Sequence, residues 1–478
     1  MDVITIFSAL FKWGTIAAGG GAILFIIFFI GSLIYKRLFP GRKTFGKGQW
    51  VVLFFLTCWF LLVLSLTTLS RGASYTGSIN ISFFSGYINA WNQWSTSEFQ
   101  LIIFNMLMFS PLGFLLPLLW KRAEKLKVIV ITSLAFTSSI EIIQLISGRG
   151  IFEFDDLFNN FIGSLMGYFF IMAILGSLRQ RKFEMASILR ALIIPSFVSI
   201  VVGVTFLIYE LQPYGNMSIL PSERQNIEDI DIQTELDFSE ESATAAIYHN
   251  INAGRKRKMK EIAQQISELE DITFSNTERR EGNNRDMFGV NPNEIEYLFT
   301  YVTRTGTWDL TNFTNEGGPA SLTEDQINVY SQKYESWLSK NSLLPKTAAF
   351  YIQHDDTILR WDCEEPEDII NGGEDFCSGG IMLGLDEQGN LALLDHFISQ
   401  NQFITMEEII SPRQAYEKVL DGEFYQFVPF QKGDLLVIED WEISYTYDTK
   451  GFYQPVYEFT GYINDTENTW VGKIPAIK

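Results

Sequence analysis

The first 211 residues alternate between long apolar segments and short polar connections. About 20 apolar residues are enough for a helix to cross the hydrocarbon core of a bilayer. Six segments reach that length, and they cover residues 15–39, 50–69, 99–120, 128–147, 156–178 and 191–211. The first segment lacks a small-residue cleavage site and is too long for the core of a signal peptide, so we expect it to remain as a membrane helix.

The pattern changes after residue 211 to shorter, mixed polar and apolar stretches. Residues 212–235 are polar and contain two prolines, which predicts a linker before a domain at 236–478. Helical periodicity predicts helices at 239–269, at 322–338 after Ser321 and from Pro412 to Gly422, while alternation predicts strands at 347–361, 381–397, 435–448 and 451–463. The predicted fold class is therefore an α-helical polytopic membrane domain of six spans plus an α+β extracytoplasmic domain.

Charge supports this division and gives an orientation. Residues 1–211 hold 16 Lys and Arg against 9 Asp and Glu, whereas the remainder holds 20 against 47. The basic residues gather after the first, third and fifth spans, and cytoplasmic loops are the ones that carry an excess of Lys and Arg. We therefore expect the N-terminus and residues 212–478 outside the cytoplasm. The strongly acidic second half argues against nucleic acid as a partner.

Two cysteines of the polar half fit this orientation. Cys363 and Cys377 bracket a turn-rich acidic stretch, and in an oxidising compartment such a pair is expected to form a disulfide. Two unrelated thiols are the alternative. Cys58 lies in an apolar run and is interpreted as a buried small hydrophobic residue.

Polar and ionisable residues inside the third, fourth and fifth spans are the candidate functional residues, because such groups are costly in a membrane and usually functional. Under the predicted topology they converge on the outer third of the bilayer. Glu141, Asp155 and Asp156 are catalytic candidates, and Asn105, Gln144, Arg149 and Asn160 are ligand-binding candidates.

These residues resemble the VanZ-like membrane protein family over about residues 70–178. The resemblance rests on Asn80-Ile-Ser-Phe83-Phe84, on Asn105 through Pro111-Leu-Gly113, on Ser139-Ile-Glu141-Ile-Ile-Gln144, and on Arg149 through Asp155-Asp156, Asn160 and Gly163. Two departures are Glu153, where the family more often has Asp, and Ser82, where Pro is more usual. The resemblance implies a cell-envelope protein linked to glycopeptide (teicoplanin) resistance in Gram-positive bacteria.

The C-terminal 70 residues are similar to the ectodomains of YycH/YycI-type and PepSY-like envelope regulators, through Tyr453-Gln-Pro455-Val-Tyr457-Glu-Phe459 and Ile474-Pro475-Ala. This similarity implies a protein-binding or regulatory module.

Several functions remain open at this point. In a non-catalytic envelope protein the polar residues would hold the bundle together, and membrane lipid, a cell-wall precursor, a glycopeptide or an envelope protein would be the partner. In a membrane-embedded enzyme acting on a lipid-linked wall precursor, Glu141 would be a general base, Asp155 and Asp156 would bind a divalent cation and Arg149 would hold a phosphate or carboxylate. A sensor that acts through its ectodomain and a transporter are further alternatives.

The sequence predicts no cofactor. It contains no nucleophile elbow, no zinc-binding HExxH and no Walker loop. His354-Asp355-Asp356 is interpreted as a polar turn, with metal binding as the alternative.

Overall fold

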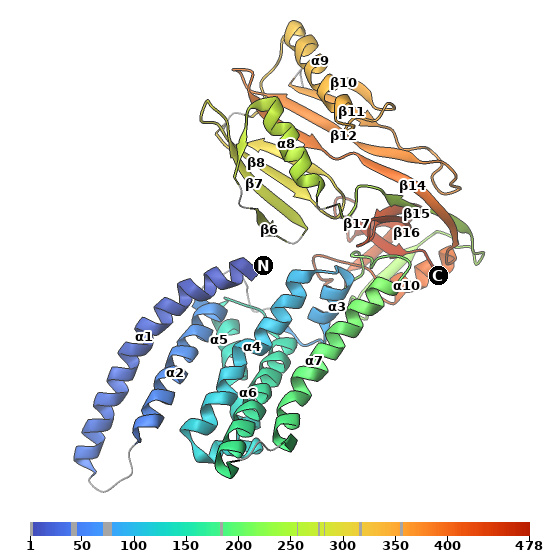
Figure 1. Cartoon of the computed structure of the whole chain (residues 1–478). Coiled ribbons are helices and arrows are strands. Elements are labelled where there is room, and N and C mark those ends of the chain that lie inside the picture. Colours follow the sequence, from blue (N-terminus) through green and yellow to red (C-terminus); the bar gives the residue numbers. More distant parts are fainter. Residues whose placement is uncertain are drawn as a thin grey trace. The chain divides into compact units, whose positions relative to one another are not determined.

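The computed structural model describes residues 3–39, 45–69, 79–181, 185–255, 257–275, 278–281, 283–314, 318–353 and 357–478. The chain forms two compact units, which Figure 1 shows as a helical part and a strand-rich part. Unit 1 comprises Met1–Ala90 and Ser95–Gln212, and unit 2 comprises Trp91–Trp94 and Pro213–Lys478. The stretch 354–356, interpreted above as a polar turn, lies outside the described residues.

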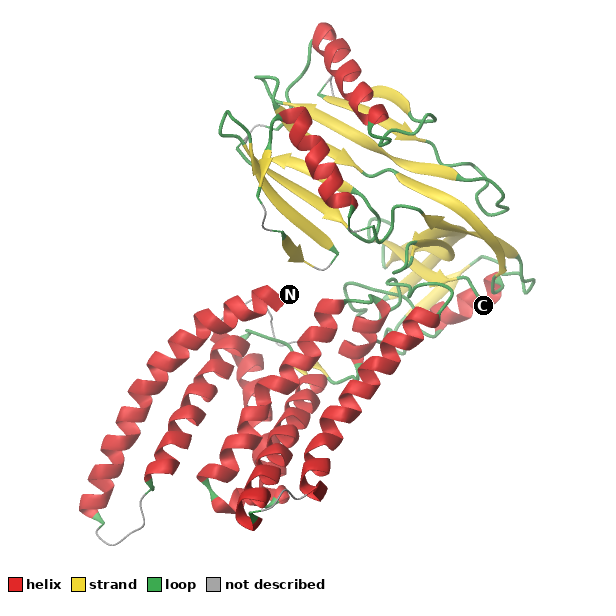
Figure 2. Cartoon of the chain, in the orientation of Figure 1, coloured by secondary structure: helices red, strands yellow, loops and turns green. Residues whose placement is uncertain are grey.

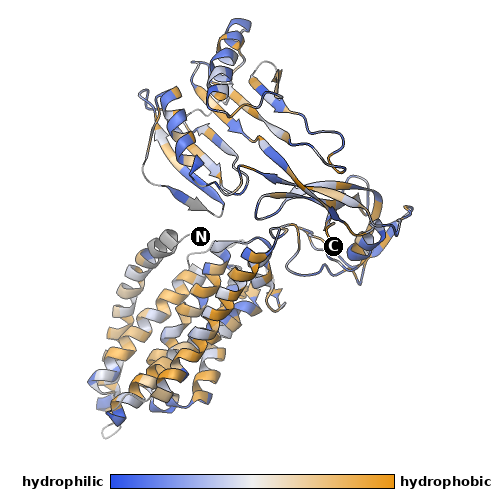
Figure 3. Ribbon diagram, turned by 45° about the vertical axis from the view of Figure 1, so that its right-hand side comes forward, coloured by the Kyte–Doolittle hydropathy of each residue, from blue (hydrophilic) through white to orange (hydrophobic). Residues whose placement is uncertain are grey.

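Within the described residues, unit 1 contains six helices that are long and apolar enough to cross a membrane. Figure 3 shows apolar residues along all six of them. They are α1 (Val3–Leu38), α2 (Lys47–Leu64), α4 (Thr96–Leu119), α5 (Leu126–Ser147), α6 (Phe154–Gln180) and α7 (Met185–Leu211). The prediction of a multi-pass membrane protein is confirmed.

Shorter elements connect these helices. A π-helical turn, Ser65–Leu69, extends α2, and a 3-10 turn, Lys121–Glu124, joins α4 to α5. The short helix α3 (Ser85–Asn92) precedes α4. Strand β1 (Ile79–Asn80) pairs in parallel with β2 (Phe152–Glu153), so the segment before α3 lies against the connection between α5 and α6.

Helices α4 and α6 pack with their backbones in contact. A Cβ atom on Gly163 of α6 would overlap the carbonyl oxygen of Met106, and one on Gly167 would overlap that of Ser110. From the other side, a Cβ atom on Gly113 of α4 would overlap the carbonyl oxygen of Ser164. Lipid chains are as apolar as the helices, so membrane helices associate through close packing and not through a hydrophobic drive. Small residues at the interface make that close packing possible.

We expect Gly163→Ala to destabilise unit 1, because its methyl group would force α4 and α6 apart. Overpacking of this kind costs about 1–3 kcal/mol. Gly203→Ala on α7 is the matched control, since nothing lies within 4 Å of a Cβ atom at that position. Thermal unfolding of the purified full-length variants in detergent measures the effect. Equal midpoints for the two variants would contradict the expectation.

The described residues of unit 2 form a 15-stranded sheet and three helices. Figure 2 shows the strands of this part of the chain in yellow and its helices in red. The strand order along the main path is β3-β15-β16-β4-β14-β12-β13-β9-β8-β7-β5, with β17 beside β16, β6 beside β7, and β10 and β11 joined to β12. The first strands are β3 (Asp231–Thr234), β4 (Thr244–Asn250), β5 (Thr273–Phe274), β6 (Arg279–Glu281), β7 (Asn284–Val290), β8 (Glu296–Val302) and β9 (Trp308–Asn312). The others are β10 (Ala349–Gln353), β11 (Ile358–Cys363), β12 (Phe376–Leu385), β13 (Leu391–His396), β14 (Ser399–Glu408), β15 (Leu435–Tyr447), β16 (Phe452–Ile463) and β17 (Thr469–Pro475).

Two hydrophobic cores cover different parts of this sheet. Helices α8 (Lys258–Glu270) and α9 (Glu324–Lys340) pack on one face of the strands from β8 to β13, around Phe299, Trp361 and Leu394. Helix α10 (Pro412–Leu420) packs with β15, β16 and β17 around Phe459 and Trp470. The α+β fold class predicted for this half is confirmed.

The N-terminal end of β12 links the two parts of the sheet. Residues 376–378 pair with β14, whereas residues 379–384 pair with β11. Gly379 has a φ of +85°, in the left-handed region that favours glycine. The predicted disulfide between Cys363 and Cys377 is confirmed at this junction, with 5.7 Å between the two Cα atoms.

Some local predictions for this half are wrong. The predicted helix at 239–269 contains β4, an inner strand between β16 and β14, and the helix begins later, at Lys258. Ala245, Ala246 and Ile247 are all fully buried there. Alanine favours helices in isolation, but burial between two neighbouring strands overrides that preference.

The single strands predicted at 347–361 and 381–397 are each two strands. Residues 386–390 turn the chain between β12 and β13, where the Asp386 carboxylate accepts hydrogen bonds from the backbone of Gln388 and Asn390 at 3.0 and 2.8 Å. The helix predicted at 322–338 corresponds to α9, Glu324–Lys340, and its N-cap is Thr323 and not Ser321. The helix predicted from Pro412 is confirmed, with Ser411 as its N-cap.

Of the stretch predicted as a linker, 212–235, all but Gln212 belongs to unit 2. Asn216 donates its backbone N–H to Thr449 Oγ1 at 2.7 Å, and β3 pairs in parallel with β15. The carboxylate of Asp448, which is fully buried, accepts hydrogen bonds from the backbone N–H groups of Gly215, Lys450 and Phe452.

Candidate functional site

A buried carboxylate at the start of α6 fixes the segment that leads into α3. Asp155 is 7% exposed, and its Oδ1 accepts the backbone N–H of Phe84 at 2.7 Å while its Oδ2 accepts that of Gly86 at 2.9 Å. These amides lie at the N-terminal end of α3, where unpaired N–H groups and the helix dipole favour a negative charge. Asp155 therefore binds α3 to α6.

Three further polar contacts join α6 to its neighbours. Asn105 of α4 donates to Asp156 Oδ1 at 2.6 Å, and Asn160 donates to Thr137 Oγ1 of α5 at 2.8 Å. The hydroxyl of Tyr87 on α3 donates to Asn159. The first two turns of α6 thus contact α3, α4 and α5 through side-chain hydrogen bonds.

Glu141 lies in the same region and contacts the backbone of β2. It is 1% exposed, and its Oε2 accepts the backbone N–H of Glu153 on β2 at a long 3.5 Å. One turn further along α5, Gln144 donates to the carbonyl oxygen of Thr67 at 3.1 Å. The side-chain oxygens of Gln144 and Asn160 are buried without a hydrogen-bond partner in the described part of the chain.

The structure thus brings Asn105, Asp155, Asp156 and Asn160 together around the start of α6, with Glu141 beside β2. Arg149 lies in the connection between α5 and α6, half-buried, and among the described residues its side chain pairs with none of these groups. Sequence reasoning missed Tyr87, Thr137 and Asn159. Asn159 stands next to Asn160, but Tyr87 carries no local signal of its role.

We expect Asp155→Ala to free the segment before α3, because two backbone N–H groups lose their acceptor. Amide hydrogen exchange of Phe84 and Gly86, measured on the full-length protein in nanodiscs, should become faster by about tenfold or more. Asp156→Ala is the matched control, because it removes the neighbouring carboxylate, whereas the N–H groups of Phe84 and Gly86 donate to Asp155. Unchanged exchange in Asp155→Ala would refute this role.

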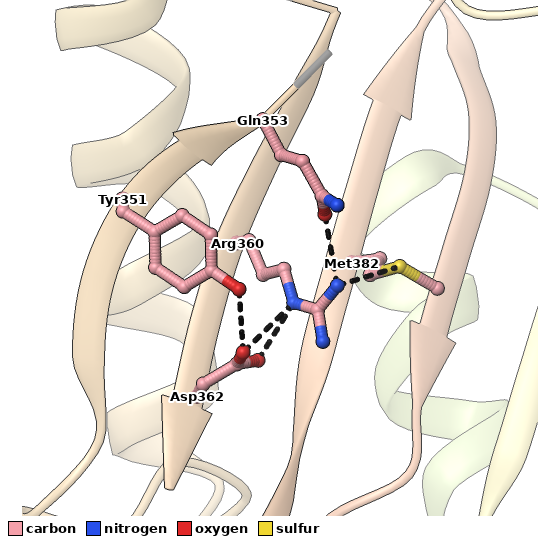
Figure 4. Close-up of polar contacts among 5 residues, drawn as sticks. All are labelled: Tyr351, Gln353, Arg360, Asp362 and Met382. Atoms are coloured by element: carbon pink, nitrogen blue, oxygen red, sulfur yellow. Dashed lines mark hydrogen bonds and ion pairs between the residues drawn. The ribbon is translucent and has the colours of Figure 1, made fainter. Parts of the chain in front are cut away.

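The second polar region of the chain is the face of the unit 2 sheet opposite α8 and α9. Cross-strand register places Tyr351, Arg360, Met382, Asp395, Asp309, Thr300 and Asp286 in one row across six strand pairings. Figure 4 shows one end of this row, where the guanidinium of Arg360 donates to both oxygens of Asp362 and to Gln353 at 2.8–2.9 Å. The hydroxyl of Tyr351 donates to the same carboxylate at 2.6 Å.

The other end of the row is acidic. Burial raises the pKa of Asp309 to about 6, and the neighbouring charges of Asp395 and Asp286 add to the rise. Burial also raises the pKa of Asp395. Among the described residues, no group of three or more His, Cys, Asp or Glu side chains is placed to hold a metal ion.

This acidic end should make the stability of unit 2 depend on pH. Because the folded-state pKa of Asp309 lies above that of the unfolded chain, its ionisation costs stability as pH rises from about 4 to about 6. The free energy of unfolding of Asp309→Asn should therefore equal that of wild type near pH 4 and exceed it by ~1 kcal/mol at pH 7. This value is discounted for the partial exposure of the carboxyl group.

Unfolding of unit 2 by urea in the full-length protein, with limited proteolysis as the readout at both pH values, measures this difference. Glu439→Gln on β15 removes the same charge from an exposed position and is the control. A pH-independent gain, or an equal gain in the control, would contradict the assignment to Asp309.

Comparison with known proteins finds a family match within the helical unit. Residues 50–176 match the family model described as VanZ/LLP1, and this segment runs from α2 into α6 and contains every polar contact of unit 1 described above. Residues 50–176 are therefore similar to the VanZ/LLP1 family. No curated protein matches the chain.

Two solved structures show a distant likeness. One is an uncharacterized protein from Eubacterium rectale ATCC 33656, 11% identical, with 52% of this chain and 87% of that chain covered and a TM-score of 0.24. The other is the C-terminal domain of YpeB from Bacillus megaterium, 11% identical, with 47% of this chain and 99% of that chain covered and a TM-score of 0.21.

Proposed function

We propose that this protein is a VanZ-like integral membrane protein of the bacterial cell envelope that acts in glycopeptide (teicoplanin) tolerance or cell-wall homeostasis. The observation that carries the proposal is the polar network at one end of the VanZ-like helices, centred on the start of α6. Buried polar groups in a membrane domain are expensive and are retained where they shape a site.

We further propose that this end of the bundle and unit 2 face the outside of the cell. Basic residues follow α1, α4 and α6, and an excess of Lys and Arg is typical of cytoplasmic connections, which supports this orientation. The disulfide of unit 2 supports an oxidising compartment for the domain that follows α7.

The contacts favour a non-catalytic role over catalysis in this network. Both oxygens of Asp155 accept backbone N–H groups, and Asp156 accepts the amide of Asn105, so these carboxylates already serve as acceptors between elements. A carboxylate used in this way holds a fixed geometry around the site. Glu141, buried on α5 beside β2, is the residue at which a catalytic role would show.

Complementation tests this proposal. Cells that lack the protein should become more susceptible to teicoplanin, and wild type should restore tolerance. Asp155→Ala should fail to complement while being present in the membrane, because the geometry around α3 is lost. Gly203→Ala is the matched control and should complement fully, since its Cβ atom meets open space.

Three further variants separate the alternatives. If Glu141→Gln is folded and present but fails while Asp156→Asn complements, a membrane-embedded enzyme acting on a lipid-linked wall precursor is favoured. If deletion of 213–478 alone abolishes function, a sensor acting through unit 2 is favoured. If wild type does not alter susceptibility in the deleted strain, the proposed role in tolerance is wrong.

A further inference from the structure

A large apolar groove runs along the outer surface of α4 in unit 1. Its volume is about 1400 Å³, and it is lined by residues of α2, α4, α6 and α7 together with Phe84 and Tyr87. A second groove of about 730 Å³ shares Trp59, Leu107 and Pro111 with the first. Both therefore lie on the same side of α4.

The packing of the helices explains why this side is open. Helix α7 packs against α6, and it meets α4 near one end through Phe99 and Phe206, whose ring centroids are 5.9 Å apart. Most of α7 is exposed along the rest of its length, with Phe197 66% exposed. An apolar space at this depth of a membrane is filled by hydrocarbon, because water there would find no hydrogen-bond partners.

One end of the groove reaches polar groups. Thr96, Gln100 and Tyr87 line it there, and Tyr87 belongs to the network around Asp155 and Asn159 through its bond to Asn159. A groove that is apolar along its length and polar at one end matches a molecule with a hydrocarbon chain and a polar head.

The charged residues near the polar end of the groove indicate which lipid headgroup it would bind. Among the residues that the structure describes, none that lines the groove carries an ionised side chain, and the charged residues nearest in sequence on α4 and α6 are Glu98, Asp155 and Asp156. Arg149 follows α5, a helix that contributes no residue to the lining. An anionic phosphate would meet acidic groups here, whereas hydroxyl groups can both donate to and accept from Gln100 and Thr96.

We propose that the groove binds one membrane lipid with an uncharged, hydroxyl-rich headgroup, a glycolipid, with its chains along α4 and α7 and its head at Gln100. This site goes beyond the role in glycopeptide tolerance and does not depend on it.

The test uses the full-length protein in nanodiscs made of equal parts phosphatidylglycerol and diglucosyl-diacylglycerol, with the retained lipids identified by native mass spectrometry. Wild type should retain the glycolipid in preference to the phospholipid. Val198→Trp fills the groove from α7 and should lower retained glycolipid by about tenfold, because its ring takes the place of chain contacts. Val204→Trp, on the same helix but outside the lining and 47% exposed, is the matched control.

Gln100→Leu addresses the head. It should leave the number of bound lipids unchanged and remove the preference for glycolipid. If Val198→Trp proves unfolded by thermal denaturation, Ile103→Trp fills the groove from α4 and replaces it. Equal retention by the groove-filling variant and Val204→Trp, preference for phosphatidylglycerol, or no retained lipid in wild type would each overturn the proposal.

Discussion

The contact between α4 and α6 is the constraint on which the membrane unit depends. Gly113, Gly163 and Gly167 let the two backbones touch, and any larger residue at these positions would overlap a carbonyl oxygen of the facing helix. This contact brings the start of α6 beside Asn105 of α4. Without it, the polar side chains of α6 would face lipid, where unpaired polar groups are costly.

The same contact explains how carboxylates can be buried in an apolar bundle. Asp155 and Asp156 stand at the N-terminal end of a helix, where the helix dipole favours negative charge, and each accepts a hydrogen bond from a neighbouring element. The charges are therefore compensated locally by backbone and amide donors. On the opposite side of α4 the surface is apolar and open, so the bundle combines a closed polar side with a groove suited to lipid.

Unit 2 depends on a different junction, the end of β12 at which two parts of one sheet meet. The chain bends there at Gly379, and the disulfide between Cys363 and Cys377 spans the strands on either side of the bend. Each part of the sheet buries its own core against its own helices. The disulfide therefore restrains the junction in β12 through which the two parts of the sheet, each with its own core, are joined.

The sequence by itself determined the six membrane helices, the α+β class of the second half and the disulfide, because apolar length, periodicity and cysteine placement are local properties. It also drew attention to Asp155, Asp156 and Glu141, since ionisable residues stand out in apolar segments. The partners of these residues came from the tertiary structure: Asp155 meets amides 69 and 71 residues away, and nothing in the local pattern specifies them. Strand β4 was missed for the same reason, because its alanines favour a strand only when neighbours bury both of its faces. Local pattern fixes which segments can be helices or strands, whereas long-range packing decides what each polar group meets.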